Sequence, residues 1–182
     1  RGIVCTTSDK DRAPNVVDLI QYPARVYPVG RLDKDSEGLL LMTNQGELAN
    51  EIMHAGNFHE KEYLVTVDQP FNAAFLKKMR EGVELKELGV TTRPCKVEAA
   101  GVKTFRIILT QGLNRQIRRM CAELGYRVVT LKRVRIMNIH LGKLNTGDFR
   151  RATPKELEEL EWQLEQARLE REEAELLAGQ DE

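Results

Sequence analysis

Residues Gly30–Asn44 have the sequence GRLDKDSEGLLLMTN, in which a charged segment is followed directly by four large apolar residues. The apolar run Leu39–Met42 lies between Gly38 and the turn-forming sequence TNQG at 43–46, a pattern typical of a strand buried on both faces. The charged segment would then be fixed to the core at one end. Such an attachment holds a carboxylate in place and partly shields it from water, so we expect an active-site element with Asp33 as its functional residue.

Charge is distributed unevenly along the 182 residues, although the formal net charge is +0. Residues 155–182 contain eleven Asp and Glu against three Lys and Arg, which leaves seventeen acids and twenty-five bases in residues 1–154. Seven of those bases fall between 115 and 135, where Glu123 is the only acid. This basic concentration predicts a polyanion as partner, and solvated arginines on a helix face are the alternative.

Cysteine usage and hydropathy indicate the cellular setting. Cys5, Cys95 and Cys121 are an odd number, lie far apart and lack Cys-x-x-Cys spacing, which argues against a disulfide framework or a zinc site. No apolar segment approaches the roughly 18 residues that a membrane span requires, and the N-terminus has no signal-peptide pattern. We therefore expect a soluble protein of the reducing cytoplasm.

The expected strands outnumber the helices and do not alternate strictly with them. Alternating apolar residues predict a strand at 61–67, and apolar residues at i, i+3, i+4 and i+7 predict a helix from Ile117 to Leu124 that ends at Gly125. The fold class is therefore α+β, with a mixed, mainly antiparallel sheet flanked by helices. Further strands are expected at 26–29, 103–110, 126–131 and 134–139, and further helices at 48–53 and 72–80.

Residues 153–182 are expected to form an acidic C-terminal helix and tail, separate from a catalytic domain at 1–152. Thr153-Pro154-Lys155-Glu156 is a capping box with proline at the first helical position, which contributes roughly 1 kcal/mol to the helix. Leucines follow at heptad spacing until charge takes over at Arg171. We expect the helix to dock through its first turns and to fray beyond this arginine.

The sequence disfavours several common site chemistries. Asp33, Asp35 and Glu37, with Gly38 at position six, imitate the start of a calcium loop, but position twelve is Asn44 instead of the required glutamate. Glycine-rich nucleotide-binding motifs, metal-ligand spacing of histidines and a serine nucleophile elbow do not occur. What remains is a carboxylate in a turn, a tyrosine on a strand and arginines on a helix. Taken alone, each of them is by default interpreted as a salt-bridge or core residue.

Three motifs together resemble those of a known family, the ribosomal pseudouridine synthases. Gly30–Asn44, Lys61-Glu62-Tyr63 and the sequence GLNRQIRRM at Gly112–Met120 are similar, in order and spacing, to the branch that comprises type A, which acts on the small ribosomal subunit, and types B, E and F, which act on the large one. The likeness extends from the start of the sequence to about residue 152. Residues 59–68 and 135–138 resemble the F type most. The resemblance implies the pseudouridine synthase catalytic fold for this part of the chain.

The resemblance implies an enzyme that isomerises a specific uridine of ribosomal RNA, expected in the 23S rRNA of the large subunit, to pseudouridine. On matching positions Asp33 is the catalytic carboxylate, Tyr63 the tyrosine that lies on the uracil, and Arg118 the basic partner of Asp33. A guanidinium favours an ionised carboxylate, and a tyrosine offers a stacking face and a hydroxyl for proton transfer. Because the reaction is a redox-neutral isomerisation, neither a cofactor nor a metal is expected.

The resemblance also implies RNA contacts beyond these three residues. The target uridine is expected to flip out of its helix, with Arg31 filling its place or holding a phosphate, while Asp35 fixes the loop by hydrogen bonds. The expected partner is a structured stem-loop of ribosomal RNA, bound by a monomer. The residues expected to bind it are Arg31, Lys61, Arg115, Arg119, Lys132 and Arg133.

Members of this branch usually carry a small S4-type RNA-binding domain ahead of the catalytic domain. The present sequence opens at Arg1 within an expected strand, so we expect a fragment that lacks this domain.

Two other functions fit parts of the pattern. A non-catalytic ribosomal-RNA-binding or ribosome-assembly module would need the basic surface but not the carboxylate of Asp33. A calcium-sensing or structural protein would be built on the loop that contains Asp33. An Asp33→Asn variant that binds RNA without forming pseudouridine separates the enzyme from the first alternative, and a calcium titration tests the second.

Overall fold

The computed structural model of the protein describes residues 16, 20 and 22–179, so the strand expected at Arg1 lies outside the described residues. In this part of the chain no helix is both long enough and apolar enough to cross a membrane. The elements follow in the order β1 (Tyr27–Pro28), β2 (Glu37–Gly38), β3 (Met42–Thr43), α2 (Gly46–Met53), the 3-10 helix η1 (Ala55–Asn57), β4 (Lys61–Val67), α3 (Ala73–Glu81), β5 (Glu84–Leu85), β6 (Val90–Thr91), β7 (Lys96–Ala99), β8 (Thr104–Leu109), α4 (Gln116–Glu123), β9 (Val128–Ile136), β10 (Ile139–His140) and α5 (Pro154–Ala178).

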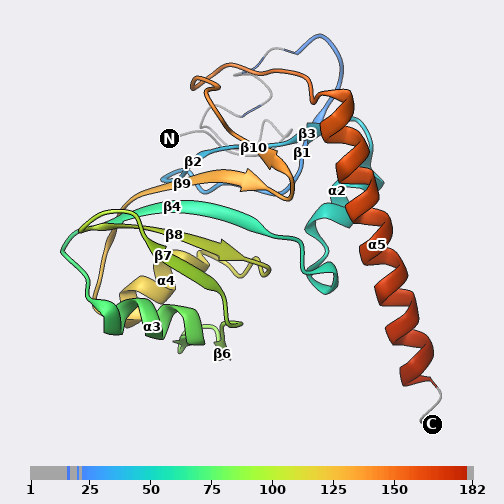
Figure 1. Cartoon of the computed structure of the whole chain (residues 1–182). Helices are drawn as coiled ribbons and strands as arrows, with labels where there is room; N and C mark the ends of the chain where they lie inside the picture. The colour runs from blue at the N-terminus through green and yellow to red at the C-terminus, as the bar shows by residue number, and fades with distance from the viewer. Residues whose placement is uncertain (1–15, 17–19, 21, 180–182) are drawn as a thin grey trace.

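One sheet of six strands organises the described chain, in the order β10-β9-β4-β8-β7 with β2 also beside β9. Its neighbouring strands are antiparallel except for β2 and β9, which run parallel. The central strand β4 occupies the residues predicted for it, and Val65 and Val67 turn into the core as their alternation requires. α3 and α4 cover one face of the sheet (Figure 1). The predicted α+β class with a mixed, mainly antiparallel sheet is confirmed.

α3 and α4 begin and end where the sequence predicts. The side chain of Asn72 caps α3 by accepting a hydrogen bond from the Phe75 N–H at 2.9 Å, and Gly82 ends the helix with a φ of 109°. Gly125 follows α4 with a φ of 85°, the left-handed conformation expected there. The buried apolar side chains of the two helices pack on the sheet and are Phe75, Met79, Ile117, Met120 and Cys121.

The strand expected at Leu39–Met42 is wrong in its extent. Only Leu39 of this run is buried. The strand β2 ends just before the run, and β3 begins at its last residue, Met42. The Leu39 N–H donates to the Arg133 carbonyl at 2.7 Å, whereas the Leu41 carbonyl accepts from the Val29 N–H at 2.8 Å. The run therefore crosses from the main sheet to the small β1/β3 sheet, because its two ends bond to different partners.

The two strands expected at 126–131 and 134–139 are one continuous strand, β9, followed by the short β10. Lys132 and Arg133 do not interrupt it, since side chains alternate across a strand and one is exposed while the other is buried. The chain turns instead at Met137, whose φ is 52°. Lys132 and Arg133 therefore project from opposite faces of the sheet.

α5 is longer than predicted, because it continues for 25 residues instead of fraying after Arg171. Its two buried leucines join the second core cluster, which also contains side chains of α2, β9 and β10. Arg168 forms an ion pair with Glu51 at 3.2 Å, and Arg171 donates to the side chain of Asn57 at 3.1 Å. These contacts hold the later turns against α2 and η1 (Figure 1). The domain boundary at residue 152 stays a prediction.

The first turn of α5 gives a prediction on stability. Glu156 accepts hydrogen bonds from Arg150 at 2.7 and 2.9 Å and from the Thr153 N–H at 2.9 Å. These bonds, that of Arg150 first, lower the pKa of Glu156 from 4.5 to about 2. A lowered folded-state pKa stabilises the fold above 4.5, and this contribution is lost as the pH falls towards 2.

Glu156→Gln is therefore expected to lower the free energy of unfolding by about 1 kcal/mol at neutral pH, measured by urea denaturation. The difference from the parent should narrow as the pH falls from 4.5 to 3. Glu158→Gln, at an exposed position of the same helix, is the matched control and should change stability little. A loss that stays constant over this pH range would contradict the role of the ionised carboxylate.

Candidate active site

The charged loop 31–36 is docked on the sheet through β2. The Ser36 N–H donates to the Asp33 carbonyl at 2.9 Å, which closes a turn, and Gly38 then lies opposite Arg133 in the parallel pair of β2 and β9. Gly38 has a φ of 117°, and a Cβ at this position would collide with the backbone of Arg133. Only glycine lets the loop approach the strand this closely. Asp33 is thus attached to the sheet at one end, as predicted.

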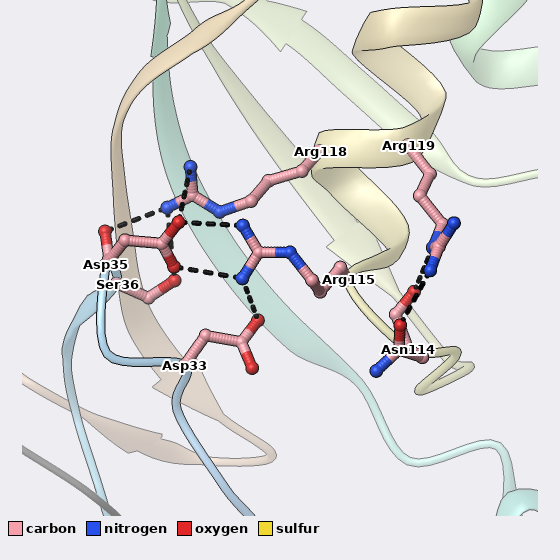
Figure 2. A network of polar contacts seen from close by, with 7 residues as sticks. All are labelled: Asp33, Asp35, Ser36, Asn114, Arg115, Arg118 and Arg119. Carbon is pink, nitrogen blue, oxygen red and sulfur yellow. Dashed lines mark hydrogen bonds and ion pairs between the residues drawn. The ribbon is translucent and has the colours of Figure 1, made fainter.

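Arg115 bridges the two carboxylates of the loop. Its Nη1 lies 3.3 Å from Oδ2 of Asp33, and its two terminal nitrogens donate to Asp35 at 3.1 and 2.7 Å. Figure 2 shows the guanidinium between the two acids. The hydrogen bonds from Arg115 hold the pKa of Asp35 below its usual value. Asp35 therefore fixes the loop by charged hydrogen bonds, the role predicted for it.

Arg118 contacts the same loop but at a different place, so its predicted pairing with Asp33 is corrected. Its Nη2 donates to the Asp35 carbonyl at 2.8 Å and lies 3.4 Å from Oγ of Ser36, and its Nη1 is 3.5 Å from Oδ2 of Asp35. The ion pair with Asp33 is made by Arg115 instead. The cause is the left-handed conformation of Arg115, with a φ of 47°, directly before α4. Arg115 thus pairs with both loop carboxylates, while Arg118, in the first turn of α4, reaches the loop backbone.

Tyr63 lies beside the loop because both flank the same residue of β9. Arg133 is the partner of Tyr63 on one side and of Gly38 on the other. At the usual strand spacing the backbones of Tyr63 and Gly38 are therefore about 10 Å apart. Tyr63 is half-buried, so part of its ring stays accessible. The geometry brings the predicted tyrosine and the predicted carboxylate loop to one place.

Lys61 and Arg133 are interior residues, although the sequence predicts them as RNA-binding residues. Arg133 is 2% exposed, and it donates from Nε to the Leu39 carbonyl at 2.8 Å and from Nη1 to the Arg31 carbonyl at 3.4 Å. Lys61 is 5% exposed. Neither side chain lies on the outer surface of the described chain, where an RNA backbone would bind.

The other predicted RNA-binding residues are dispersed. Arg31 is exposed within the loop, whereas Lys132 is exposed on the sheet face opposite to that of Arg133. Arg119 pairs with Glu87 and with Asn114, pointing away from the two loop carboxylates (Figure 2). A cavity of about 310 Å³ lies beside this arginine, between α4 and the turn after β5. The predicted basic surface is thus divided by the sheet.

The calcium alternative finds no support in this arrangement. The carboxylates of Asp33 and Asp35 face the guanidinium of Arg115, whose positive charge would repel a cation at the same place. Among residues 22–179, no group of three or more His, Cys, Asp or Glu side chains is arranged to hold a metal ion.

The bridging geometry of Arg115 makes a testable prediction. Arg115→Lys keeps the positive charge but cannot bond both carboxylates at once, so the rate of product formation is expected to fall about tenfold or more. The measurement is the single-turnover rate at saturating RNA. Arg106→Lys is the matched control, because Arg106 pairs with a carboxylate, Glu62, on the opposite face of the sheet. Equal rate losses in the two variants would contradict a special role of Arg115.

The family of the chain follows from its similarity to known proteins. Residues 1–123 match the family model described as RNA pseudouridylate synthase. A solved structure described as a pseudouridylate synthase superposes with a TM-score of 0.82 at 32% identity, over 88% of this chain and 70% of that one. The chain belongs to the RNA pseudouridylate synthase family.

Three relatives place the chain within this family. The dual-specificity RNA pseudouridine synthase RluF of Escherichia coli (strain K12) is 52% identical over 159 residues, which are 87% of this chain and 54% of RluF. Ribosomal large subunit pseudouridine synthase B of Bacillus subtilis (strain 168) is 35% identical over 88% of this chain and 68% of its own length. Ribosomal small subunit pseudouridine synthase A of Yersinia pestis is 32% identical over 86% of this chain and 68% of its own length. The predicted resemblance to the F type is confirmed, and the chain spans about half the length of RluF.

Proposed function

We propose that this chain isomerises a specific uridine of ribosomal RNA, in the 23S rRNA, to pseudouridine. The observation that carries the proposal is the ion-paired loop of Asp33, docked on the sheet beside Tyr63 in a chain of this family. The relatives named for ribosomal subunits support a ribosomal substrate. The name of RluF adds a second RNA as a substrate to be tested, since it describes dual specificity.

In this proposal Asp33 is the catalytic carboxylate and Tyr63 lies on the uracil of the flipped nucleotide. The C1′–N1 bond breaks, the uracil turns, and a C1′–C5 bond forms while the C5 proton is removed and N1 gains a proton. No atom or electron is gained overall, so the reaction needs no oxidant or cofactor. Arg115 orients the carboxylate by its ion pair at 3.3 Å, and the docked β2 keeps the loop in place during the rotation.

The proposed partner is a structured RNA stem-loop, which offers a phosphate backbone to the exposed basic residues. Arg31 lies in the active-site loop itself and is exposed, which suits the predicted contact with the helix that the uridine leaves. The monomeric state and the cytoplasmic location stay predictions.

The experiment that tests this function maps pseudouridine directly. Transcripts of 23S rRNA, 16S rRNA and tRNA are incubated with the chain and mapped by carbodiimide labelling and reverse transcription. The same mapping is done on RNA from cells with and without the gene. A pseudouridine that depends on the protein supports the proposal. RNA binding with no isomerisation in either setting would overturn it in favour of the non-catalytic module.

A further inference from the structure

Two buried cations beside the candidate active site lack a carboxylate partner. Lys61 and Arg133 are 5% and 2% exposed, and no ion pair joins either of them to an acid in the described part of the chain. Nη2 of Arg133 is buried and has no hydrogen-bond partner there. Buried charges are normally paired, because removing an ion from water costs several kcal/mol. Two buried cations without an acidic partner indicate that a negatively charged group binds in this site.

Both cations lie on the face of the sheet that carries Tyr63. Lys61 precedes Tyr63 by two residues on β4, and Arg133 is directly opposite Tyr63 on β9, so the three side chains project to the same side. Burial, and after it the charge of Arg133, lower the pKa of Lys61. Burial, and after it the charge of Lys61, likewise lower the pKa of His59, whose buried Nε2 has no partner either. Glu51 partly offsets this positive charge at His59, whereas no acid of the described chain does so at Lys61.

An RNA substrate supplies two kinds of negative charge, that of its backbone phosphates and that of the detached uracil. The burial of Lys61 and Arg133 favours the uracil. A phosphate of the RNA backbone is best served by exposed side chains such as Arg31. A base that lies on Tyr63 brings its oxygen atoms next to the face of β4 and β9. When the C1′–N1 bond breaks, the uracil leaves with the bonding electron pair and carries a negative charge that is shared with its carbonyl oxygens.

We propose that Nζ of Lys61 and Nη2 of Arg133 form a subsite for the charged oxygen of the detached uracil. This inference rests on the proposed function. The two donors lie on adjacent strands of the sheet and carry positive charge before the bond breaks, so this charge acts where negative charge develops. Lys61 and Arg133 are then catalytic residues that act on the base, in addition to Asp33.

Lys61→Met removes the charge at similar volume, and it is expected to lower the single-turnover rate about 100-fold with little change in RNA affinity. Lys61→Arg should restore the rate to within about tenfold of the parent, because it returns the charge. Lys96→Met, at an exposed position of β7, is the control and should leave both quantities unchanged. An unchanged rate in Lys61→Met would overturn the inference. So would a loss confined to RNA affinity and its salt dependence, which would assign the subsite to a phosphate.

A second measurement uses the parent chain and does not depend on turnover or on a variant that folds. Barbiturate, a pyrimidine that is anionic at neutral pH, is expected to bind at least about tenfold more tightly than uracil in calorimetric titrations. Equal affinities, or displacement of barbiturate by inorganic phosphate at similar concentration, would overturn the inference. A parent chain that prefers barbiturate but forms no pseudouridine would contradict the proposed function alone.

Discussion

Asp33→Asn is expected to abolish pseudouridine formation, lowering the single-turnover rate by at least about 10⁴-fold while RNA binding is retained. The amide has nearly the same shape as the carboxylate, so the turn from Asp33 to Ser36 and the docking of β2 should persist. The variant loses the negative charge of the Asp33 carboxylate, whose Oδ2 lies 3.3 Å from Nη1 of Arg115. The measurement is conversion of the mapped uridine at saturating RNA, with affinity measured separately.

Asp35→Asn is the matched control, since it removes the same charge two residues later on the same loop. Asp35 is held by Arg115 through two hydrogen bonds and has no proposed contact with the base. We expect a loosened loop and a rate loss of about tenfold, the cost of one weakened charged hydrogen bond. Turnover that survives in Asp33→Asn, or is lost equally in Asp35→Asn, would overturn the assignment of Asp33.

The fold was largely predictable because its main elements are specified by local periodicity. The strand at 61–67 and the helix at 72–80 follow from residue type and spacing alone. The extent of the strand at Leu39–Met42 was not predictable, because an apolar run shows burial but not that its two ends bond to different sheets. The path of this run depends on its hydrogen bonds to Val29 and Arg133, which lie outside the run.

The partner of Asp33 was not predictable for a related reason. Arg115 and Arg118 are both near the start of one helix, and the choice between them depends on a single left-handed residue, Arg115, before α4. The burial of Lys61, in contrast, left a signal in the sequence. Lys61 lies an even number of positions before Tyr63, Val65 and Val67. The two-residue period of the strand therefore places Lys61 on the same, inner face despite its charge.

Gly38→Ala is expected to separate the active-site loop from the sheet. The added methyl group would overlap the backbone of Arg133, and backbone atoms of a central strand cannot move aside as a flexible side chain can. The φ of 117° adds strain for any residue with a Cβ. We expect the free energy of unfolding to fall by about 3 kcal/mol, or the loop to detach locally, with loss of turnover in either case.

Hydrogen exchange at one amide distinguishes these outcomes. The Leu39 N–H donates to the Arg133 carbonyl at 2.7 Å, so it should be protected in the parent and exchange rapidly in Gly38→Ala. Gly89→Ala is the control, because Gly89 also has a positive φ of 64° but no atom lies within 4 Å of an added Cβ. It should cost only about 1 kcal/mol and leave the Leu39 amide protected. If the two variants lose equal stability, backbone strain alone explains Gly38. If only Gly38→Ala exposes the Leu39 amide, the close approach of Gly38 to the Arg133 backbone is what keeps the loop with Asp33 attached to the sheet.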